Sequence, residues 1–573
     1  MMPIAPSSWD ESYDVIVVGS GASGLSCALT AHLEGLRVLV LEKTAHIGGS
    51  TAVSGGAVWV PLNSGSQGAG HPDTYERVWQ YLEQTVGDAS PDAMKEAFLR
   101  YGPRMLDYLA SHGVLSLTAR TYSPDYMSEL PGASNGGRAL DPAPFDARTL
   151  GRARFRELRN PLKEFLVLGG MMVNLTDVYH LLRPLRSVAS VKHTLGLLAR
   201  YVFDRVQGYH RGTRLLLGNA LAGQLFHAVI KHGVPYRLSA PVVSLLSDAH
   251  GGVVGVRVKR GDLTYNVSAQ KGVVLATGGF PWSTQLRDVL YPKPTGPWSM
   301  APEDNRGDGI SMAMDAGGAL GTRHVSPAFW APVSLLTDAQ GQVTRYPHLV
   351  WDRAKPGLIA LNHRAERFVN EADSYHAFVT ALLETNRGRS ESSAFLICDH
   401  RFIEKWGLGL ALPGGRPRNH LIENGYLKRA GSLSDLAALL KIDPDRLVAT
   451  VERYNKQAEA GLDTDFGKGS TAYNRYLGDP EHSPNPCLAP LGAGPYYAVE
   501  VVAGDIGTAC GVQTNSFAQA LDSTGEPISG LFVVGNDMQS VMGGAYPGPG
   551  ITLGPGLTFG WVAAQYMAGN LPN

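Results

Sequence analysis

Short apolar runs that end in glycine-rich turns mark both ends of this chain. Residues 14–18 and 36–41 consist largely of valine, isoleucine and leucine, a pattern typical of parallel strands buried on both faces. Residues 24–33 lie between them and predict a connecting helix. Further strands that end in glycine are predicted over residues 272–279 and 530–536. The pattern predicts a sheet to which both chain ends contribute.

The middle of the chain follows a different pattern. Its loops are longer and carry more tryptophan, proline and charge, with strands predicted over 358–362, 368–371 and 395–398 and helix over 433–454. At 573 residues the chain is too long for one compact core. We therefore predict an α/β fold with two domains: a discontinuous Rossmann-like domain of residues 1–280 and 489–573, and an inserted α+β domain of residues 281–488.

Composition narrows the class of protein. Apolar residues make up 44% of the chain and charged residues 18%, which indicates a globular protein. The net charge of −1 provides no field to attract nucleic acid, so none is expected as a partner. The four cysteines have no CxxC spacing and the 17 histidines no paired spacing, so we expect neither disulfides nor a metal site. The opening residues do not resemble a secretion signal, which favours a cytoplasmic location.

Two interpretations stay open for residues 161–217. This segment is rich in apolar residues and contains more arginine and lysine than acidic residues. It could form a basic amphipathic patch that contacts a membrane surface, or two or three helices packed on the domain built from the two chain ends. No apolar run reaches the roughly 18 to 20 residues that a membrane-spanning helix needs.

The first glycine-rich turn has the spacing of a dinucleotide-binding fingerprint. Gly19, Gly21 and Gly24 form a GxGxxG pattern between the first strand and its helix. The first glycine permits the turn, the second lets backbone approach a pyrophosphate, and the third lets helix and strand touch. Glu42 ends the next strand, where a carboxylate can accept hydrogen bonds from a ribose diol. Together these features predict a dinucleotide site.

A second loop decides between NAD and FAD. Residues 46–56 (HIGGSTAVSGG) follow Glu42 closely and resemble the corresponding loop of the flavoprotein superfamily that includes fumarate reductase and succinate dehydrogenase. In relatives with covalently attached flavin, a histidine stands just before the threonine of this loop. Ser50 occupies that position here, so the resemblance implies FAD that is bound non-covalently.

Within that superfamily the chain resembles the 3-ketosteroid Δ1-dehydrogenases over nearly its whole length. The match is carried by SPDY at 123–126, RFVNEADSY at 367–375 and YPGPG at 546–550. The resemblance implies that Tyr375 is the general base and that Tyr126 assists it. It also implies that the Tyr546 hydroxyl and the Gly550 amide hold the substrate ketone.

The fingerprint and the resemblance together imply a cofactor site built from both chain ends. Its expected residues are Gly19, Gly21, Ala22, Ser23, Gly24, Glu42, Lys43, Gly49, Ser50, Thr51, Ser54, Gly55, Gly56, Val242, Thr277, Gly278, Gly279, Asn536, Asp537 and Leu553.

These residue types suit the removal of hydrogen beside a ketone. Two donors at the ketone oxygen stabilise a developing enolate, the base takes the C2 proton, and hydride leaves C1 for flavin N5. Tyrosine is an awkward base, because ionising a group of pKa near 10 costs about 4 kcal/mol at pH 7. A hydrogen bond from Tyr126 would offset part of that cost. The expected activity is FAD-dependent 1,2-desaturation of a 3-ketosteroid, with a quinone-type or other carrier as the electron acceptor.

Three alternatives stay open. The substrate could be a smaller cyclic ketone, or the double bond could be introduced at the Δ4(5α) position. A fumarate-reductase-like enzyme could reduce an activated alkene, which would require an arginine acid and cationic carboxylate binders. The chain could also be a flavin-binding carrier subunit without turnover of its own.

Overall fold

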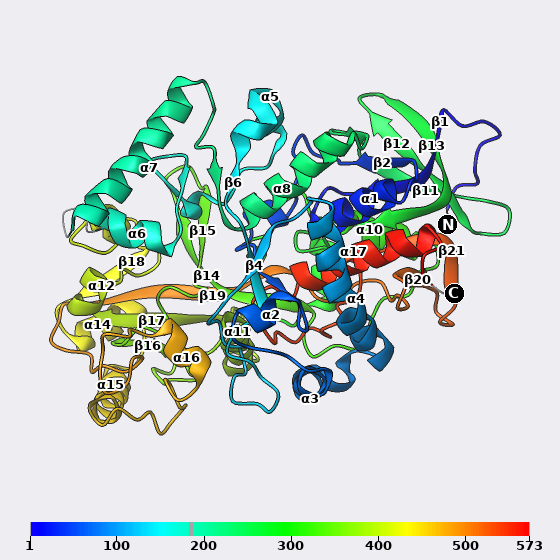
Figure 1. Ribbon diagram of the computed structural model, residues 1–573. Coiled ribbons are helices and arrows are strands. Elements are labelled where there is room, and N and C mark those ends of the chain that lie inside the picture. The colour runs from blue at the N-terminus through cyan, green and yellow to red at the C-terminus, as the bar shows by residue number, and fades with distance from the viewer. Residues whose placement is uncertain (1, 183–186, 572–573) are drawn as a thin grey trace.

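The computed structural model describes residues 2–182 and 187–571, in which two large sheets position the other elements (Figure 1). The first sheet has eight strands in the order β10-β2-β1-β13-β12-β11, with β21 paired to β13 and β20 to β21. Its central strands β2, β1, β13 and β21 are parallel, which confirms the predicted α/β class. The strands are β1 (Glu11–Val18), β2 (Val38–Leu41), β10 (Tyr236–Arg237), β11 (Val242–Ser247), β12 (Val253–Arg260), β13 (Leu263–Leu275), β20 (Gln519–Leu521) and β21 (Pro527–Val533).

Two helices join the chain ends on this sheet. α1 (Ala22–Leu33) and α17 (Leu553–Met567) are largely buried, and Figure 1 shows them side by side in blue and red. Gly560 permits their close approach, because a Cβ there would lie 2.3 Å from the Ser23 carbonyl oxygen. The Ser26 hydroxyl donates a hydrogen bond of 2.8 Å to the Leu557 carbonyl oxygen. The burial of apolar surface between α1 and α17 holds the C-terminal helix against the helix that follows the GxGxxG turn.

The second sheet is antiparallel, with the order β15-β14-β19-β17-β16 and β18 on β19. Its strands are β14 (Ala328–Thr337), β15 (Val343–Pro347), β16 (Leu358–Leu361), β17 (Ser393–Asp399), β18 (Leu427–Ala430) and β19 (Tyr496–Thr508). β19 is central to this sheet although it follows the predicted boundary at residue 489. The domain boundaries themselves stay a prediction.

The remaining elements surround these sheets. Between β2 and β10 lie β3 (Val58–Trp59), α2 (Gly65–Gly68), α3 (Tyr75–Thr85), α4 (Asp92–Ser111), β4 (Leu117–Ala119), β5 (Ala139–Pro142), β6 (Phe145–Asp146), α5 (Gly151–Glu157) and α8 (Leu217–His232). Between β13 and β19 the chain also forms α9 (Thr284–Leu290), α10 (Asp308–Asp315), α11 (Tyr375–Thr385), α12 (His400–Lys405), α13 (Asn419–Glu423), α14 (Leu433–Leu440), α15 (Pro444–Glu459) and α16 (Ala472–Leu477).

One local prediction in the middle of the chain needs correction, and a second is confirmed. The strand predicted over 368–371 is wrong: the segment is an irregular loop whose polar groups bond to side chains, among them the Asn370 carboxamide, which accepts the Ala372 amide at 2.9 Å. The helical part predicted over 433–454 is confirmed and consists of two helices, α14 and α15. Lys441 adopts a left-handed φ of 56° at the end of α14, and Pro444 begins α15, so the chain turns where one helix would have continued.

The segment 161–217 contains the expected helices. It forms β7 (Leu166–Val167), β8 (Met171–Met172), α6 (Leu175–Leu182), α7 (Val188–Val206) and β9 (Arg214–Leu215); residues 183–186 lie outside the described part of the chain. α7 keeps apolar side chains in solvent, with Val188, Leu195, Val202, Phe203 and Val206 each more than half exposed. No helix among the described residues has the length and apolar character needed to cross a bilayer.

Candidate active site

A cavity of about 1000 Å³ lies where the parallel strands of the first sheet end. Val18, Leu41, Ala276 and Gly535, which end or follow β1, β2, β13 and β21, all line it. Ligands of open α/β sheets bind at this carboxyl edge. The volume is at the upper end of the range for ligand pockets, which leaves room for a dinucleotide and a second molecule.

The start of α1 forms one part of the cavity. Gly21 is the helix N-cap and has no side chain to cover the first turn. A Cβ at Gly21 would find its nearest atom, Thr51 Oγ1, only at 3.8 Å, and one at Gly55 would meet nothing within 4 Å. The backbone at the N-terminus of α1 therefore faces open space in the cavity. The partial positive charge at this helix end favours binding of a phosphate group. This arrangement fits the pyrophosphate of FAD.

Glu42 has the position expected of a ribose-binding acid. Its Oε2 accepts hydrogen bonds from the Ser20 amide at 3.2 Å and the Ser20 hydroxyl at 2.6 Å, and Oε1 accepts the Thr44 amide at 2.9 Å. These bonds hold the buried carboxylate at the cavity wall between the first two strands.

Most of the predicted cofactor residues line this cavity. They are Gly19, Gly21, Ala22, Ser23, Glu42, Lys43, Gly49, Ser50, Thr51, Ser54, Gly55, Gly56, Val242, Thr277, Gly278, Asn536 and Leu553. The other three, Gly24, Gly279 and Asp537, support the lining from behind. A Cβ at Gly24 would lie 2.2 Å from the Gly19 carbonyl oxygen, as expected for the glycine that lets helix and strand touch.

Asp537 holds the turn after β13. Its carboxylate accepts hydrogen bonds from the Thr277 amide at 2.5 Å, the Thr277 hydroxyl at 3.0 Å and the Gly279 amide at 2.8 Å. Burial raises the pKa of this carboxyl, and the amide donors counteract the rise. A residue from the C-terminal end thus shapes the cofactor loop of a strand about 260 positions earlier.

Asn305 and Asp308 also line the cavity, although neither was among the predicted site residues. Asn305 Nδ2 donates to Ser50 Oγ at 2.8 Å and to the Gly278 carbonyl oxygen at 3.1 Å, while Asp308 forms an ion pair with Lys43 at 2.5 Å. Both belong to the NRGDG turn at 305–309, which has no regular periodicity. The glycines of this turn were the only feature of the sequence that could have indicated a role for Asn305 and Asp308 in the site.

The three predicted tyrosines meet at the cavity although they are far apart in the sequence. The Tyr126 hydroxyl donates to the Tyr375 hydroxyl at 3.0 Å, and the Tyr375 hydroxyl donates to the Tyr546 hydroxyl at 2.7 Å. The rings of Tyr126 and Tyr546 stack with centroids 5.3 Å apart. All three side chains are buried and, with Gly550, line the cavity. We refer to these hydroxyls as the tyrosine row.

Local contacts place the ends of this row. The Pro547 carbonyl oxygen accepts the Tyr126 amide at 2.9 Å and the Tyr81 hydroxyl at 2.7 Å, which ties the SPDY segment to the YPGPG loop. Gly550 has φ of +103°, and a Cβ there would lie 2.4 Å from the Ala57 carbonyl oxygen. The loop can therefore take only glycine at this position.

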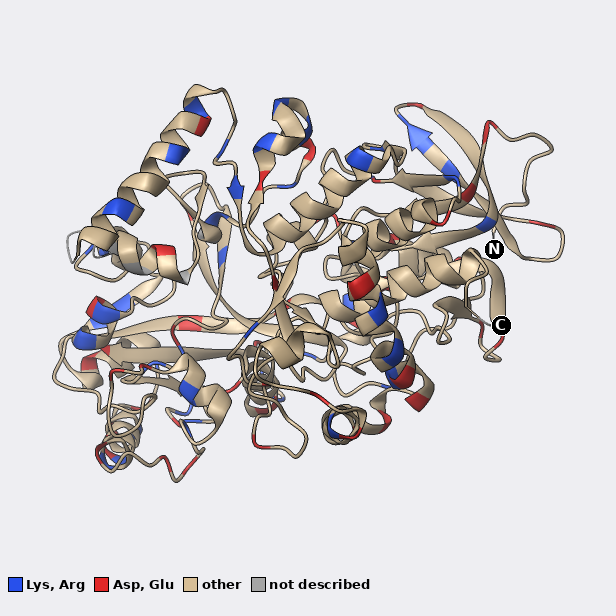
Figure 2. Cartoon of the chain, in the orientation of Figure 1, with Lys and Arg blue, Asp and Glu red and all other residues tan. Residues whose placement is uncertain are grey.

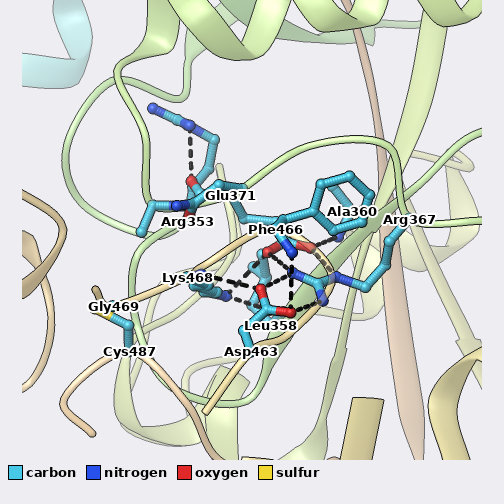
Figure 3. A network of polar contacts seen from close by, with 12 residues as sticks. Arg353, Leu358, Ala360, Arg367, Glu371, Asp463, Phe466, Lys468, Gly469 and Cys487 are labelled. Atoms are coloured by element: carbon cyan, nitrogen blue, oxygen red, sulfur yellow. Dashed lines mark hydrogen bonds and ion pairs between the residues drawn. The ribbon is translucent and has the colours of Figure 1, made fainter. Parts of the chain in front are cut away.

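A buried charge network fixes the loop before Tyr375 (Figure 3). Arg367 bonds both Glu371 oxygens, at 2.8 and 2.7 Å, and both Asp463 oxygens, at 3.0 and 2.9 Å. Lys468 Nζ lies 3.6 Å from Glu371, and Arg353 donates to the Glu371 carbonyl oxygen at 2.9 Å. Burial alone would raise the pKa of the Glu371 carboxyl, but Arg367 and Lys468 lower it below its usual value.

Burial also decides the protonation of the tyrosine row. Removal from water raises the pKa of Tyr126, Tyr375 and Tyr546 above the usual value of a tyrosine, because an apolar environment disfavours the phenolate. All three hydroxyls are therefore neutral at pH 7, and Tyr546, which accepts from Tyr375, keeps its own proton to donate into the cavity.

Comparison with known proteins identifies the family of the chain. A family model described as "FAD binding domain" matches residues 14–553, nearly the whole chain. Among curated relatives, a 4-oxocyclohex-2-ene-1-carboxylate 5-dehydrogenase of Sinomonas cyclohexanicum is 38% identical, covering 97% of this chain and 93% of the relative. A 3-oxosteroid 1-dehydrogenase of Mycolicibacterium smegmatis is 35% identical, covering 97% of each.

A solved structure supports the same assignment. The crystal structure of 3-ketosteroid Δ1-dehydrogenase from Sterolibacterium denitrificans, in complex with 1,4-androstadiene-3,17-dione, superposes with a TM-score of 0.89 at 37% identity and covers 98% of this chain and all of that one. FAD is thus the cofactor, as predicted. The chain belongs to the FAD-binding domain family, and within it is a homologue of the 3-ketosteroid Δ1-dehydrogenases.

Proposed function

We propose that this protein is an FAD-dependent dehydrogenase that introduces the 1,2 double bond into a 3-ketosteroid. The observation that carries the proposal is the tyrosine row at the cavity wall. It combines a hydroxyl that can donate to a ketone with a second hydroxyl, 2.7 Å away, that can remove a proton beside that ketone. Neither a reductase of activated alkenes nor a flavin carrier requires this pair.

Each residue has one task in the reaction. Tyr546 donates a hydrogen bond from its hydroxyl to the ketone oxygen, and the Gly550 amide supplies the second donor, so that negative charge developing on the enolate is stabilised. This polarisation makes the C2 proton acidic, and the phenolate form of Tyr375, a minor fraction at neutral pH, accepts it. Tyr126, which donates to Tyr375, stabilises the phenolate form of the base.

The cofactor part of the site has a separate task. The backbone at Gly21, the Glu42 carboxylate and the turn held by Asp537 would bind and orient FAD. Bound FAD supplies the acceptor for the hydride that leaves C1. The buried tyrosines exclude water, which strengthens their hydrogen bonds to the charge that develops on the substrate.

The decisive experiment is anaerobic mixing of the purified protein with androst-4-ene-3,17-dione. We expect the flavin absorbance to bleach and the product to be the 1,4-diene. Intact flavin absorbance with this ketone, together with bleaching by another ketone, would remove the steroid assignment while leaving the dehydrogenase assignment.

A smaller cyclic ketone is the second candidate substrate, and one observation favours it. The cavity is also lined by Lys355, whose ammonium donates to the Gly478 carbonyl oxygen at 2.8 Å. A cation at the wall suits a ketone that carries a carboxylate, as the named substrate of the Sinomonas relative does. Comparing kcat/KM for 4-oxocyclohexanecarboxylate and the steroid in one assay decides between the two classes.

We further propose that the enzyme works in the cytoplasm at a membrane surface and passes its electrons to a quinone-type carrier. The four cysteines are unpaired, which supports a reducing compartment. The exposed apolar residues 188, 195, 202, 203 and 206 recur along α7, and Lys192, Arg200 and Arg205 lie on the same helix. Figure 2 shows these basic positions along α7. Apolar and basic groups together favour an anionic bilayer surface.

Vesicle flotation tests the membrane contact. The protein should float with vesicles that contain phosphatidylglycerol, and the double variant Val202→Ser, Phe203→Ser should not. Val289→Ser, which removes an even more exposed apolar side chain on α9, is the control and should float like the wild type. Reoxidation of the reduced flavin by a water-soluble quinone but not by NAD would support the acceptor class.

A further inference from the structure

Tyr473 is a further tyrosine at the cavity, outside every motif of the sequence. Its side chain is only 2% exposed, it lines the same cavity as the tyrosine row, and its ring centroid lies 4.7 Å from that of Tyr126. Within the described part of the chain, its hydroxyl has no hydrogen-bond partner. A buried hydroxyl without a partner is unfavourable, so a group that enters the cavity would be its natural partner.

The backbone around Tyr473 is fixed to both catalytic segments. The Tyr473 amide donates to Ser128 Oγ at 3.0 Å, two residues after Tyr126. The next residue, Asn474, is fully buried, and its Nδ2 donates to Asp373 Oδ1 at 2.9 Å, two residues before Tyr375. The position of Tyr473 relative to the tyrosine row is therefore set by hydrogen bonds on two sides.

The neighbourhood of the hydroxyl is electrostatically coupled to the row. Burial is the main cause of the raised pKa of Tyr546, and Tyr473 adds to it. Burial likewise raises the pKa of Tyr473, with Tyr126 as the next cause. Both observations indicate that the Tyr473 hydroxyl is close to the reacting groups and protonated, so that it can act as a donor.

We propose that Tyr473 is a further substrate-binding residue, whose hydroxyl donates a hydrogen bond to an oxygen of the bound ring ketone. This inference rests on the proposed function. Tyr126 and Tyr375 donate their hydroxyl protons within the tyrosine row and Tyr546 donates to the ketone, whereas the Tyr473 hydroxyl has no partner among the described residues and is free to bind the ligand. The inserted domain thereby contributes a binding contact that completes the site only when substrate is present.

Tyr473→Phe tests the role, because it removes the hydroxyl and keeps the ring against Tyr126. Binding of 1,4-androstadiene-3,17-dione to the oxidised holoenzyme can be followed by the change in flavin absorbance. We expect Kd to rise about three- to tenfold, the range for one lost hydrogen bond, and kcat/KM to fall at least as much. FAD content should be unchanged, and Tm without ligand should be unchanged or higher, since an unpaired buried hydroxyl is removed.

Tyr454→Phe is the matched control. Tyr454 is equally buried in the inserted domain but does not line the cavity, so its variant should bind the dione like the wild type. Wild-type Kd in Tyr473→Phe, or a slower flavin reduction with unchanged Kd, overturns the binding role. If the wild-type protein itself binds no ketone and no ketone bleaches its flavin, the proposed function fails as well, so the two failures are distinguishable.

Discussion

The hydroxyl of Tyr375 lies between two others, and this position decides how it can act as a base. It accepts from Tyr126 and donates to Tyr546. Tyr375→Phe removes the proton acceptor but preserves ring packing and leaves the FAD site untouched. Flavin reduction by the ketone should slow by about 10²- to 10⁴-fold, the usual contribution of a general base. Flavin absorbance should show normal FAD content, and turnover at the wild-type rate would exclude Tyr375 as the base.

Burial of Tyr375 also predicts how the rate depends on pH. Because burial raises the pKa of this hydroxyl above its usual value, its phenolate fraction is small at neutral pH and grows about tenfold per pH unit below the pKa. The rate of flavin reduction should therefore rise with pH from about 6 to 9 with no plateau. Anaerobic stopped-flow measurements across this range check it. A plateau that begins near pH 7 would point to a different base.

At the residue scale, the sequence located the chemistry but not its geometry. Tyr126 and Tyr375 are 249 positions apart, and Tyr375 and Tyr546 are 171 apart. Their assignment to one active site was predicted from the family resemblance alone. Tyr473 carries no motif, since an ordinary tyrosine in a short helix looks like a core residue. The lack of a hydrogen-bond partner for its hydroxyl becomes visible only in the folded structure.

At the scale of the secondary-structure elements, the position of α1 depends on the close approach of Gly24 to the backbone of Gly19. A Cβ at Gly24 would lie 2.2 Å from the Gly19 carbonyl oxygen, and both atoms belong to rigid backbone. Gly24→Ala should therefore push α1 away from β1, lower stability by roughly 1–3 kcal/mol and release FAD. Thermal unfolding and flavin content measure both effects.

Gly196→Ala is the control for this change, since Gly196 lies within α7 and an added Cβ meets nothing within 4 Å. It should leave FAD content unchanged and stabilise the helix by up to about 1 kcal/mol. Equal behaviour of the two alanine variants would contradict the steric argument.

The conformation of the loop before α11 depends on buried ion pairs between Glu371 and the side chains of Arg367 and Lys468. Glu371→Gln leaves Arg367 and Lys468 with one fewer carboxylate in a buried site. Breaking a buried pair in this way should lower the free energy of unfolding by about 3–5 kcal/mol, and displacement of Tyr375 should slow flavin reduction. Urea unfolding and stopped-flow kinetics test the two effects. Glu366→Gln, an exposed pair with Arg364, should change stability by less than about 1 kcal/mol.

This charge network explains why one element was predicted wrongly. The apolar positions at 368 and 369 suggested a strand, but neighbouring side chains satisfy the loop's polar groups and remove the need for strand pairing. Glu371 itself accepts the Ala360 amide at 3.0 Å. The strands of the first sheet were predictable because apolar runs and glycine turns coincide there. A loop stabilised by distant side chains has no periodic pattern to detect.

At the scale of the whole molecule, the cofactor site unites the two chain ends. β1 and α1 come from the first, β21 and α17 from the second, and Asp537 bonds to the turn after β13. FAD bound across these segments should stabilise the native state in proportion to the logarithm of its concentration, by about 2.7 kcal/mol at one hundred times Kd. Protein stripped of FAD should therefore unfold at a lower temperature, and Tm should rise steadily as the concentration of added FAD is increased.

A cofactor fragment makes this test specific. FMN lacks the adenosine phosphate that the start of α1 and Glu42 are placed to bind, so at equal concentration it should raise Tm less than FAD does. Limited proteolysis of the stripped protein should cut both the glycine loop at 46–56 and the loop at 546–550, since the same ligand holds them. If Tm did not depend on FAD, or if FMN stabilised as well as FAD, the two chain ends would be held together by their own packing and the cofactor would merely fill the space between them.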